Sequence, residues 1–466
     1  MTNSTQASTD GLIGRILKNM GLLFGGKTSA VLIGLVVLAI AARALTVEEL
    51  GVLLLLHAFI AMMTGIATFK SWQALIQFGA DPVEQADLPR LHSLLRFTIG
   101  LDLAAAVFAA TISTCVLLII RDHLGIPDDI VGIAIAYCLM SATNLRSTPL
   151  GVLRLYDRFD LISLHDQAVP VVRLIGASLG LFLGGGLTWF VLVWMAAAAS
   201  TNLVMPALAL RELSRQGALV GLFKRRPTLK APEQGLWRYV WMSNIDATID
   251  LLDKQMPTLL AGGLLGPAFA ALFKIARDIS DVLGKGARLL NQVLYPELVR
   301  LMISGNTRRA IRIIGYSSIY LLGAGILLAV LISLVGPSVL GAALDQDYAA
   351  VTPIATMLVI AAALMGATAP IYSGLYALGN PGRAALARAI TVSVTMSLFI
   401  ALAYTIGDSG PGWAMVIGTG IGLIVASIIA LARVQSARDA SGQADLREIV
   451  SEETSSESTD PPARSG

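Results

Sequence analysis

The sequence predicts an all-α integral membrane protein with about twelve transmembrane helices, and three observations support this prediction. Hydrophobic residues make up 55% of the 466-residue chain and charged residues only 14%, whereas an ordinary soluble protein has about 25% charged residues. Windows of roughly 17 to 25 apolar residues, the helix length that crosses a bilayer, recur along the chain. Lysine and arginine are concentrated in alternate connections between these windows. The composition therefore excludes an ordinary soluble protein.

Each predicted span is an apolar window bounded by polar or turn-forming residues. The twelve windows lie near residues 20–44, 51–69, 96–120, 130–150, 165–184, 188–209, 237–260, 267–289, 310–335, 350–377, 386–406 and 411–434. The seventh and eighth windows are less apolar than the others because they contain several charged side chains.

The distribution of basic residues predicts the orientation of the spans. Connections on the side of the N-terminus contain 19 lysines and arginines, whereas those on the other side contain one, Arg121. Because basic residues are retained in cytosolic loops, we expect both termini in the cytosol. The first ten residues, MTNSTQASTD, lack the basic region that begins a signal peptide, which agrees with a cytosolic N-terminus.

The longest internal connection divides the predicted spans into two groups of six. We expect an N-terminal six-helix lobe at 1–210, a basic cytosolic linker at 211–236 and a C-terminal six-helix lobe at 237–436. The linker combines apolar and basic residues, so we expect it to form a helix on the anionic membrane surface; a plain solvated loop is the alternative. The polar tail, 437–466, is predicted to be disordered.

Charged side chains within the spans are the candidate site residues, because an ionisable group in hydrocarbon is costly unless it faces a cavity or a partner. In the eighth window, charges recur on one helix face from Lys274 to Arg288, and in the seventh window acids share a face. The basic candidates for substrate binding are Lys27, Arg173, Lys274, Arg277 and Lys285. The carboxylate candidates for ion coupling or for lining the cavity are Asp102, Asp246, Asp250, Asp253, Asp278 and Asp281. As an alternative, the stripes in the seventh and eighth spans pair only with each other.

Motifs of catalysis are absent from the sequence. It contains no HExxH, GxSxG, Walker or CxxC motif, and its four histidines are scattered through separate segments. We therefore expect no catalytic residue, no metal site, no nucleic-acid partner and no cofactor, apart from H⁺ or Na⁺ as a coupling ion.

Four segments resemble motifs of the polysaccharide-export flippases of the Wzx (O-antigen-like) type, which belong to the multidrug/oligosaccharidyl-lipid/polysaccharide flippase (MOP) superfamily. They are AARALTVEELG (41–51), PLGVLRLYDRFDLIS (149–163), YPELVRLMISGN (295–306) and LYALGNPGRAALARA (375–389). Thr46 and Val47 replace a Gly-Pro pair that is usual in the first motif. The resemblance covers nearly the whole chain and implies a MATE-like fold of two six-helix lobes.

The resemblance also implies a function, a place and partners. The protein would move undecaprenyl-diphosphate-linked oligosaccharide across the bacterial inner membrane for lipopolysaccharide, capsule or exopolysaccharide synthesis, by alternating access of the two lobes. The basic candidates would offset the diphosphate charge. The partners would be the lipid-linked oligosaccharide, membrane lipids and the polymerase or export machinery.

Two other functions remain open from the sequence. An ion-coupled multidrug antiporter of the same superfamily would share the fold, but it would prefer a cavity rich in acids and aromatic residues. A membrane glycosyltransferase or polymerase would need a sizeable loop on the far side of the membrane, where the longest loop has about 14 residues.

Overall fold

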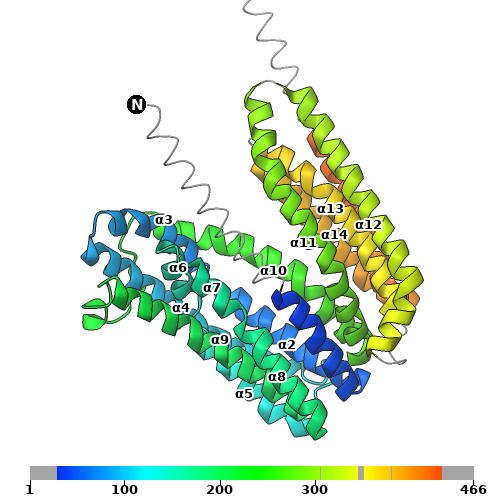
Figure 1. The fold of residues 1–466 in the computed structure, drawn as a ribbon, viewed down its shortest axis with the longest axis horizontal. Helices are drawn as coiled ribbons and strands as arrows, with labels where there is room; N and C mark the ends of the chain where they lie inside the picture. The colour runs from blue at the N-terminus through cyan, green and yellow to red at the C-terminus, as the bar shows by residue number, and fades with distance from the viewer. Residues whose placement is uncertain (1–28, 305, 345–350, 379, 433–466) are drawn as a thin grey trace, which may run out of the picture. The chain divides into compact units, whose positions relative to one another are not determined.

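The computed structural model describes residues 29–304, 306–344, 351–378 and 380–432 (Figure 1). Within these ranges the chain is helical and contains no strand, which confirms the predicted all-α class. Lys27, the start of the first predicted span and the tail at 437–466 lie outside the described residues.

Most of the described helices follow one another with short connections, and the longest connection precedes α10. After a first helix, Ser29–Ala44, the helices up to the basic linker are α2 (Val47–Ala67), α3 (Ser71–Glu84), α4 (Leu88–Ile120), α5 (Val131–Leu139), α6 (Ser147–Leu155), α7 (Phe159–Asp166), α8 (Ala168–Leu183) and α9 (Leu187–Arg215). The later helices are α10 (Leu236–Leu265), α11 (Pro267–Ile303), α12 (Thr307–Leu344), α13 (Val351–Ala377), α14 (Pro381–Ile406) and a last helix over 410–432.

Eight helical stretches of the described chain are long and apolar enough to cross a membrane. One of them, Gly382–Ala432, spans 51 residues and contains the last two predicted windows. Helices α10 and α11 are 30 and 37 residues long, yet they are not among the eight. They contain the seventh and eighth windows, whose charged residues lower the hydropathy. The helices therefore support a multi-pass membrane protein, while the direction of each crossing stays a prediction.

The described helices group into two compact units. The first unit contains the described residues up to Asp278 together with the described residues of Ile332–Ala355 and Phe399–Pro411. The second contains Ile279–Leu331, Thr356–Leu398 and the described residues from Gly412 onward. Helix α10 thus packs with the first unit, although it lies beyond the linker at which we predicted the lobe boundary.

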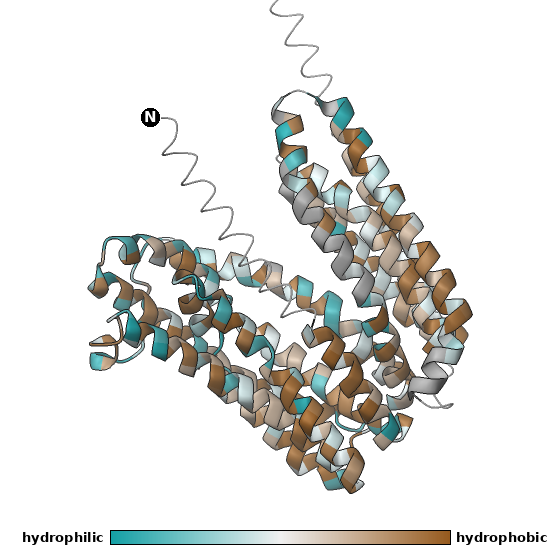
Figure 2. Cartoon of the chain, in the orientation of Figure 1, coloured by the Kyte–Doolittle hydropathy of each residue, from teal (hydrophilic) through white to brown (hydrophobic). Residues whose placement is uncertain are grey.

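The first unit is built around a core in which α3, α4, α6 and α9 meet. Helix α3 packs on α4 and α6, α6 packs on α9, and α2 packs on α4 and α10. Gly151 allows α6 to approach α3 closely, because a Cβ atom there would lie 2.9 Å from the Cα of Trp72. The second unit has small cores of its own, one around Leu298 and one around Ile371. Hydrophobic residues dominate the described helices in Figure 2.

The connections of the first lobe contain more helix than the apolar windows predict. The second span ends at Ala67, but after a three-residue break the chain continues as α3, which we expected to be a loop. The predicted fourth span is interrupted at 144–146, between a 3-10 turn and α6. Hydropathy alone does not show these breaks, because polar and apolar residues alternate across them.

The predicted surface helix in the linker is wrong. Residues 216–235 form a loop whose only helical piece in the structure is the three-residue turn Leu222–Lys224. Gly217, Gly221 and Gly235 adopt positive φ angles of 70°, 90° and 80°, which other L-residues rarely adopt. Gly217 follows the end of α9, Gly221 precedes the three-residue turn and Gly235 precedes α10, so each interrupts helical backbone. The backbone N–H of Thr228 donates to the carbonyl of Arg96 over 3.2 Å, so the loop folds onto α4.

Candidate functional site

A cavity of about 520 Å³ lies within the first unit. Its walls come from α2, α3, α5, α6, α7, α9 and α10 and from the connections that precede α3 and α6. The polar lining residues include Thr64, Asn144, Ser147, Thr201 and Asn202. A volume of this size is typical of small-molecule sites. The charged lining residues are Lys70, Arg146, Arg154 and Asp166, so the charge of the lining is positive when its histidines are neutral.

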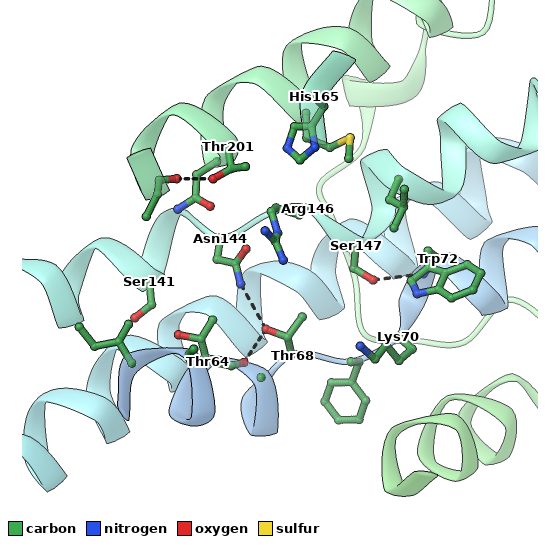
Figure 3. Close-up of a pocket in the computed structure, with 18 of the residues that line it drawn as sticks. Thr64, Thr68, Lys70, Trp72, Ser141, Asn144, Arg146, Ser147, His165 and Thr201 are labelled. Atoms are coloured by element: carbon green, nitrogen blue, oxygen red, sulfur yellow. Dashed lines mark hydrogen bonds between the residues drawn. The ribbon is translucent and has the colours of Figure 1, made fainter. Parts of the chain in front are cut away.

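Two helix breaks place Lys70 and Arg146 in this cavity. Lys70 immediately precedes α3, and Arg146 immediately precedes α6. Figure 3 shows both side chains extending into the space between the walls, beside Thr68 and Ser147. The two helices begin side by side, since the backbone N–H of Trp72 donates to the Ser147 hydroxyl over 3.2 Å. Helix N-termini carry partial positive charge, which adds to the positive charge of the two side chains.

Asp102, from the middle of α4, holds these two helix starts together. Its carboxylate accepts a hydrogen bond from the Ser71 hydroxyl over 2.5 Å and from the backbone N–H of Thr148 over 2.7 Å. The side chain is buried and does not line the cavity. A carboxylate at a helix start satisfies backbone donors that have no partner inside the helix. From the sequence, Asp102 was a candidate for ion coupling or for lining the cavity. In the structure it lies outside the cavity and holds the first turns of α3 and α6 in place.

Lys70 and Arg146 have no hydrogen bond or ion pair to any side chain in the described part of the protein. Arg146 is exposed and Lys70 is half-buried, so both can reach a ligand in the cavity. Charged groups in such sites are normally paired. Two basic side chains that lack a protein partner and share one cavity are the geometry expected for binding an anion.

The remaining ionisable lining groups are partly engaged by neighbours. The Arg154 guanidinium carbon lies 4.0 Å from the ring centroid of Trp72, and its Nε atom is buried without a hydrogen bond. His165 Nδ1 lies 3.4 Å from an oxygen of Asp166, whereas its Nε2 atom is buried without a partner. Arg154 therefore has donor capacity left for a ligand. Asp166 is the acid close to Arg146 and Arg154, whereas Asp250 is the acid close to Lys70.

Arg158 belongs to the same sequence motif as Arg154, residues 149–163, but it forms ion pairs within the protein and is not a lining residue. It forms ion pairs with Glu212 of α9, which is 2% exposed, and with Asp160 over 2.8 Å. The hydrogen bond with Asp160 raises the pKa of Arg158 above its ordinary value. Arg158 thus ties α7 to α9 and does not line the cavity.

Next to the cavity, Arg173 of α8 contacts His57 of α2. Arg173 Nη2 donates a hydrogen bond to His57 Nε2 over 3.1 Å, and His57 Nδ1 lies 2.9 Å from the Tyr137 hydroxyl oxygen. The guanidinium carbon also lies 4.7 Å from the ring centroid of Trp194. His57 and Tyr137 line the cavity but Arg173 does not. Arg173 is one of the basic candidates predicted from the sequence, whereas His57 is not among the predicted site residues.

The charged stripe of α11 is described as far as Asp281, and the pairs that it shows are local. Lys274 forms an ion pair with Asp278 one turn along the same helix. Arg277 Nη2 donates to the backbone carbonyl of Asp253 in α10 over 2.8 Å. Asp281 is exposed, whereas the Lys285 side chain lies outside the described residues.

The acids of α10 behave similarly. Asp250 forms an ion pair with Lys254 one turn later, and both side chains are largely exposed. Asp253 is half-buried, and the Asp246 side chain lies outside the described residues. Neither Asp250 nor Asp253 lines the described cavity. The proposed roles of these residues in ion coupling stay predictions.

Sequence reasoning did not select Lys70, Arg146 or Arg154 as site residues. Lys70 and Arg146 lie at the ends of predicted spans, where basic residues are usually orientation signals. Arg154 lies in a segment that we expected to be a loop. The available signal was the Arg-containing motif at 149–163, which contains Arg154 and follows Arg146 by a few residues.

Comparison with known proteins finds one relative by sequence and a similar fold in several solved structures. No family model matches the chain. It is 29% identical over 343 residues to the inner membrane protein YghQ of Escherichia coli (strain K12), an alignment that covers 73% of this chain and 95% of YghQ.

Several solved structures have a similar fold. A multidrug resistance MATE family transporter of the MOP superfamily, in an inward-facing conformation, matches with a TM-score of 0.70 and 13% identity over 88% of this chain and 96% of that chain. Lipid II flippase MurJ, in an inward closed conformation, matches with a TM-score of 0.62 and 11% identity. This match covers 87% of this chain and 86% of MurJ. The Vibrio cholerae MATE transporter VcmN, in a mutant form, matches with a TM-score of 0.57 and 15% identity. This match covers 92% of this chain and 98% of VcmN. The chain therefore has the transporter fold that MATE proteins share with MurJ.

Proposed function

We propose that this protein is a flippase that moves an undecaprenyl-diphosphate-linked oligosaccharide across the bacterial inner membrane for surface polysaccharide synthesis. The observation that carries the proposal is the cavity of the first unit, where Lys70 and Arg146 lack a protein partner beside two helix starts. Hydrogen bonds to charged groups are stronger than neutral ones, so a diphosphate suits these donors well. The polyprenyl tail can stay in lipid while the polar part crosses.

The sequence supports an entry side for the substrate. Under the predicted orientation, the connections that contain Lys70 and Arg154 face the cytosol, where lipid-linked sugars are assembled. Both termini are then cytosolic, and the substrate leaves on the far side of the membrane. No covalent chemistry is required, since the step consists of binding and alternating access of two lobes.

The fold also supports a second candidate, an ion-coupled multidrug antiporter, because the matching MATE structures include a multidrug resistance transporter. The cavity lining includes Phe69, Trp72, Tyr137 and one acid, Asp166, which are residue types that bind organic cations. Three basic residues in the same cavity oppose a cationic ligand. The charge balance therefore favours the anionic substrate.

A binding experiment separates the two functions. The purified protein in lipid nanodiscs is titrated with undecaprenyl diphosphate, undecaprenyl monophosphate, undecaprenol and the organic cation ethidium. We expect the diphosphate to bind most tightly and a Lys70→Ala/Arg146→Ala variant to lose about 100-fold in diphosphate affinity, at about 1.5 kcal/mol for each lost charged hydrogen bond.

Arg300→Ala is the matched control, because this arginine is paired with Glu297 and does not line the cavity. Its diphosphate affinity should equal that of the unmodified protein. Equal binding of undecaprenol and undecaprenyl diphosphate would overturn the proposal. Tight ethidium binding that Asp166→Asn abolishes would favour the antiporter.

A further inference from the structure

The hydrogen bonds of His57 fix its protonation state. Arginine has donors but no acceptor, so the Arg173 contact over 3.1 Å requires a lone pair on His57 Nε2. The ring proton of neutral His57 must then be on Nδ1, which donates to the Tyr137 oxygen over 2.9 Å. In this arrangement His57 is neutral, and a second proton can bind only where the arginine now donates.

The surroundings of His57 are basic. Besides Arg173 from α8, Lys274 from α11 is a cation close enough to interact electrostatically with His57, and Tyr137 from α5 is the neutral titratable neighbour. Among the described residues, no ion pair joins His57 to a carboxylate. Asp278, which faces Arg173, is paired with Lys274.

The other helices that pack on α2 add few charges near this site. Residues 103–120 of α4 and 187–210 of α9 contain no charged side chain. Helix α10 contacts α2 at Gly65 through Leu251, and the charged residues beside that contact are Asp250, Asp253 and Lys254. Protonated His57 and Arg173 would therefore be two adjacent cations with no carboxylate between them.

Arg173 has contacts other than His57 that it can use once the hydrogen bond to His57 is lost. Its guanidinium lies over the Trp194 ring, and its Nε atom is buried without a hydrogen bond. His57 and Tyr137 line the cavity that contains Lys70 and Arg146. An arginine released from His57 is thus next to the cavity that we propose to bind an anion, while His57 can take its proton from the same space.

We propose that His57 binds the coupling proton of the transport cycle, and that proton binding and the hydrogen bond from Arg173 exclude each other. The proposal rests on the proposed transport function and names its coupling ion. Because the Arg173–His57 contact joins α8 to α2, losing it changes how these helices are held together. Protonation at one residue thereby biases the packing of the unit that contains the cavity.

A spectroscopic test needs no transport. The emission of Trp194 is obtained as the difference between the protein and its Trp194→Phe variant, in nanodiscs from about pH 4 to 8, a range that extends below the one where histidine ordinarily titrates because the neighbours of His57 are cations. We expect one titration in the unmodified protein and none in His57→Gln, since the glutamine carbonyl can accept from Arg173 but cannot titrate. The exposed His123→Gln is the control and should titrate as the unmodified protein does.

A transport measurement completes the test. In vesicles, the rate of flipping a fluorescent lipid-linked oligosaccharide should change at least about fivefold between pH 5.5 and 8, and His57→Gln should remove this dependence. A Trp194 signal that is flat with pH, or that titrates equally in His57→Gln, overturns the proton site. A titrating signal without any flipping instead overturns the proposed function and leaves the proton site standing.

Discussion

Two regions of the first unit contain charged side chains among apolar helices, and they use them differently. In the cavity, Lys70 and Arg146 lie at helix breaks and have no protein partner within the described residues. On α10 and α11, Lys254 and Lys274 each pair with an acid four residues away. A charge within a span is therefore a weak sign of a binding site by itself, and the decisive property is whether the protein already satisfies it.

The largest loss in the free energy of unfolding should come from replacing Arg158, which is paired with two carboxylates. Arg158→Ala leaves the buried carboxylate of Glu212 without its cation, so we expect a loss of about 3 kcal/mol in the free energy of unfolding. Thermal unfolding of the purified protein measures this loss. Arg154→Ala, in the same segment, should lose only about 1 kcal/mol because it removes a cation–π contact. Equal losses would contradict the separation of the two arginines.

The next effect concerns the support of the cavity. Asp102→Ala removes the acceptor shared by Ser71 and the backbone N–H of Thr148, so unfolding should become easier by about 2 kcal/mol. Amide hydrogen exchange should increase at the first turns of α3 and α6. The exposed Asp81→Ala is the control and should leave both properties unchanged. Unchanged exchange in Asp102→Ala would show that the helix starts do not depend on this carboxylate.

A direct comparison of two arginines tests the difference between the regions. Arg146→Ala should lower the affinity for undecaprenyl diphosphate about tenfold, or about 1.5 kcal/mol, because an available donor is lost. Arg277→Ala should lower it less than about threefold, because this guanidinium already donates to the Asp253 carbonyl. Titration in nanodiscs measures both affinities. The reverse order would place the substrate on the charged stripe of α11.

The smallest effect is expected for the exposed pair on α10. Lys254→Ala breaks the contact with Asp250 and should change the free energy of unfolding by about 0.3 kcal/mol, the value usual for such surface pairs. Thermal unfolding at low and high salt measures it. A loss well above about 1 kcal/mol would mean that this pair is not solvent-screened.

The predicted helical class and most helix positions agree with the structure because hydropathy acts locally. The failures occur where polar contacts between distant residues decide the backbone. Asp102 joins the starts of α3 and α6, which lie far apart in the sequence, and no pattern within either segment shows that contact. The prediction of a helix in the linker was wrong for another reason: its glycines with positive φ allow the linker to turn back onto α4.

For the candidate site, the sequence identified Arg173 and Lys274, which the structure brings close to His57. It missed Lys70, Arg146 and Arg154, because residues at the ends of apolar windows look like orientation signals. It also could not reveal that His57, a single histidine in a span, accepts from an arginine. Such information depends on which side chains meet, and side chains from different helices meet only after packing.

The sequence by itself thus determined the all-helical class, the apolar segments and the asymmetry of basic residues, since each depends on local composition and on the energetic cost of placing charge in hydrocarbon. Only the tertiary structure decided where the helices break and which charges remain without a partner. Partnering is a property of pairs of residues distant in the chain, so it is the folded arrangement that separates Arg146 in the cavity from Arg158 in its ion pairs.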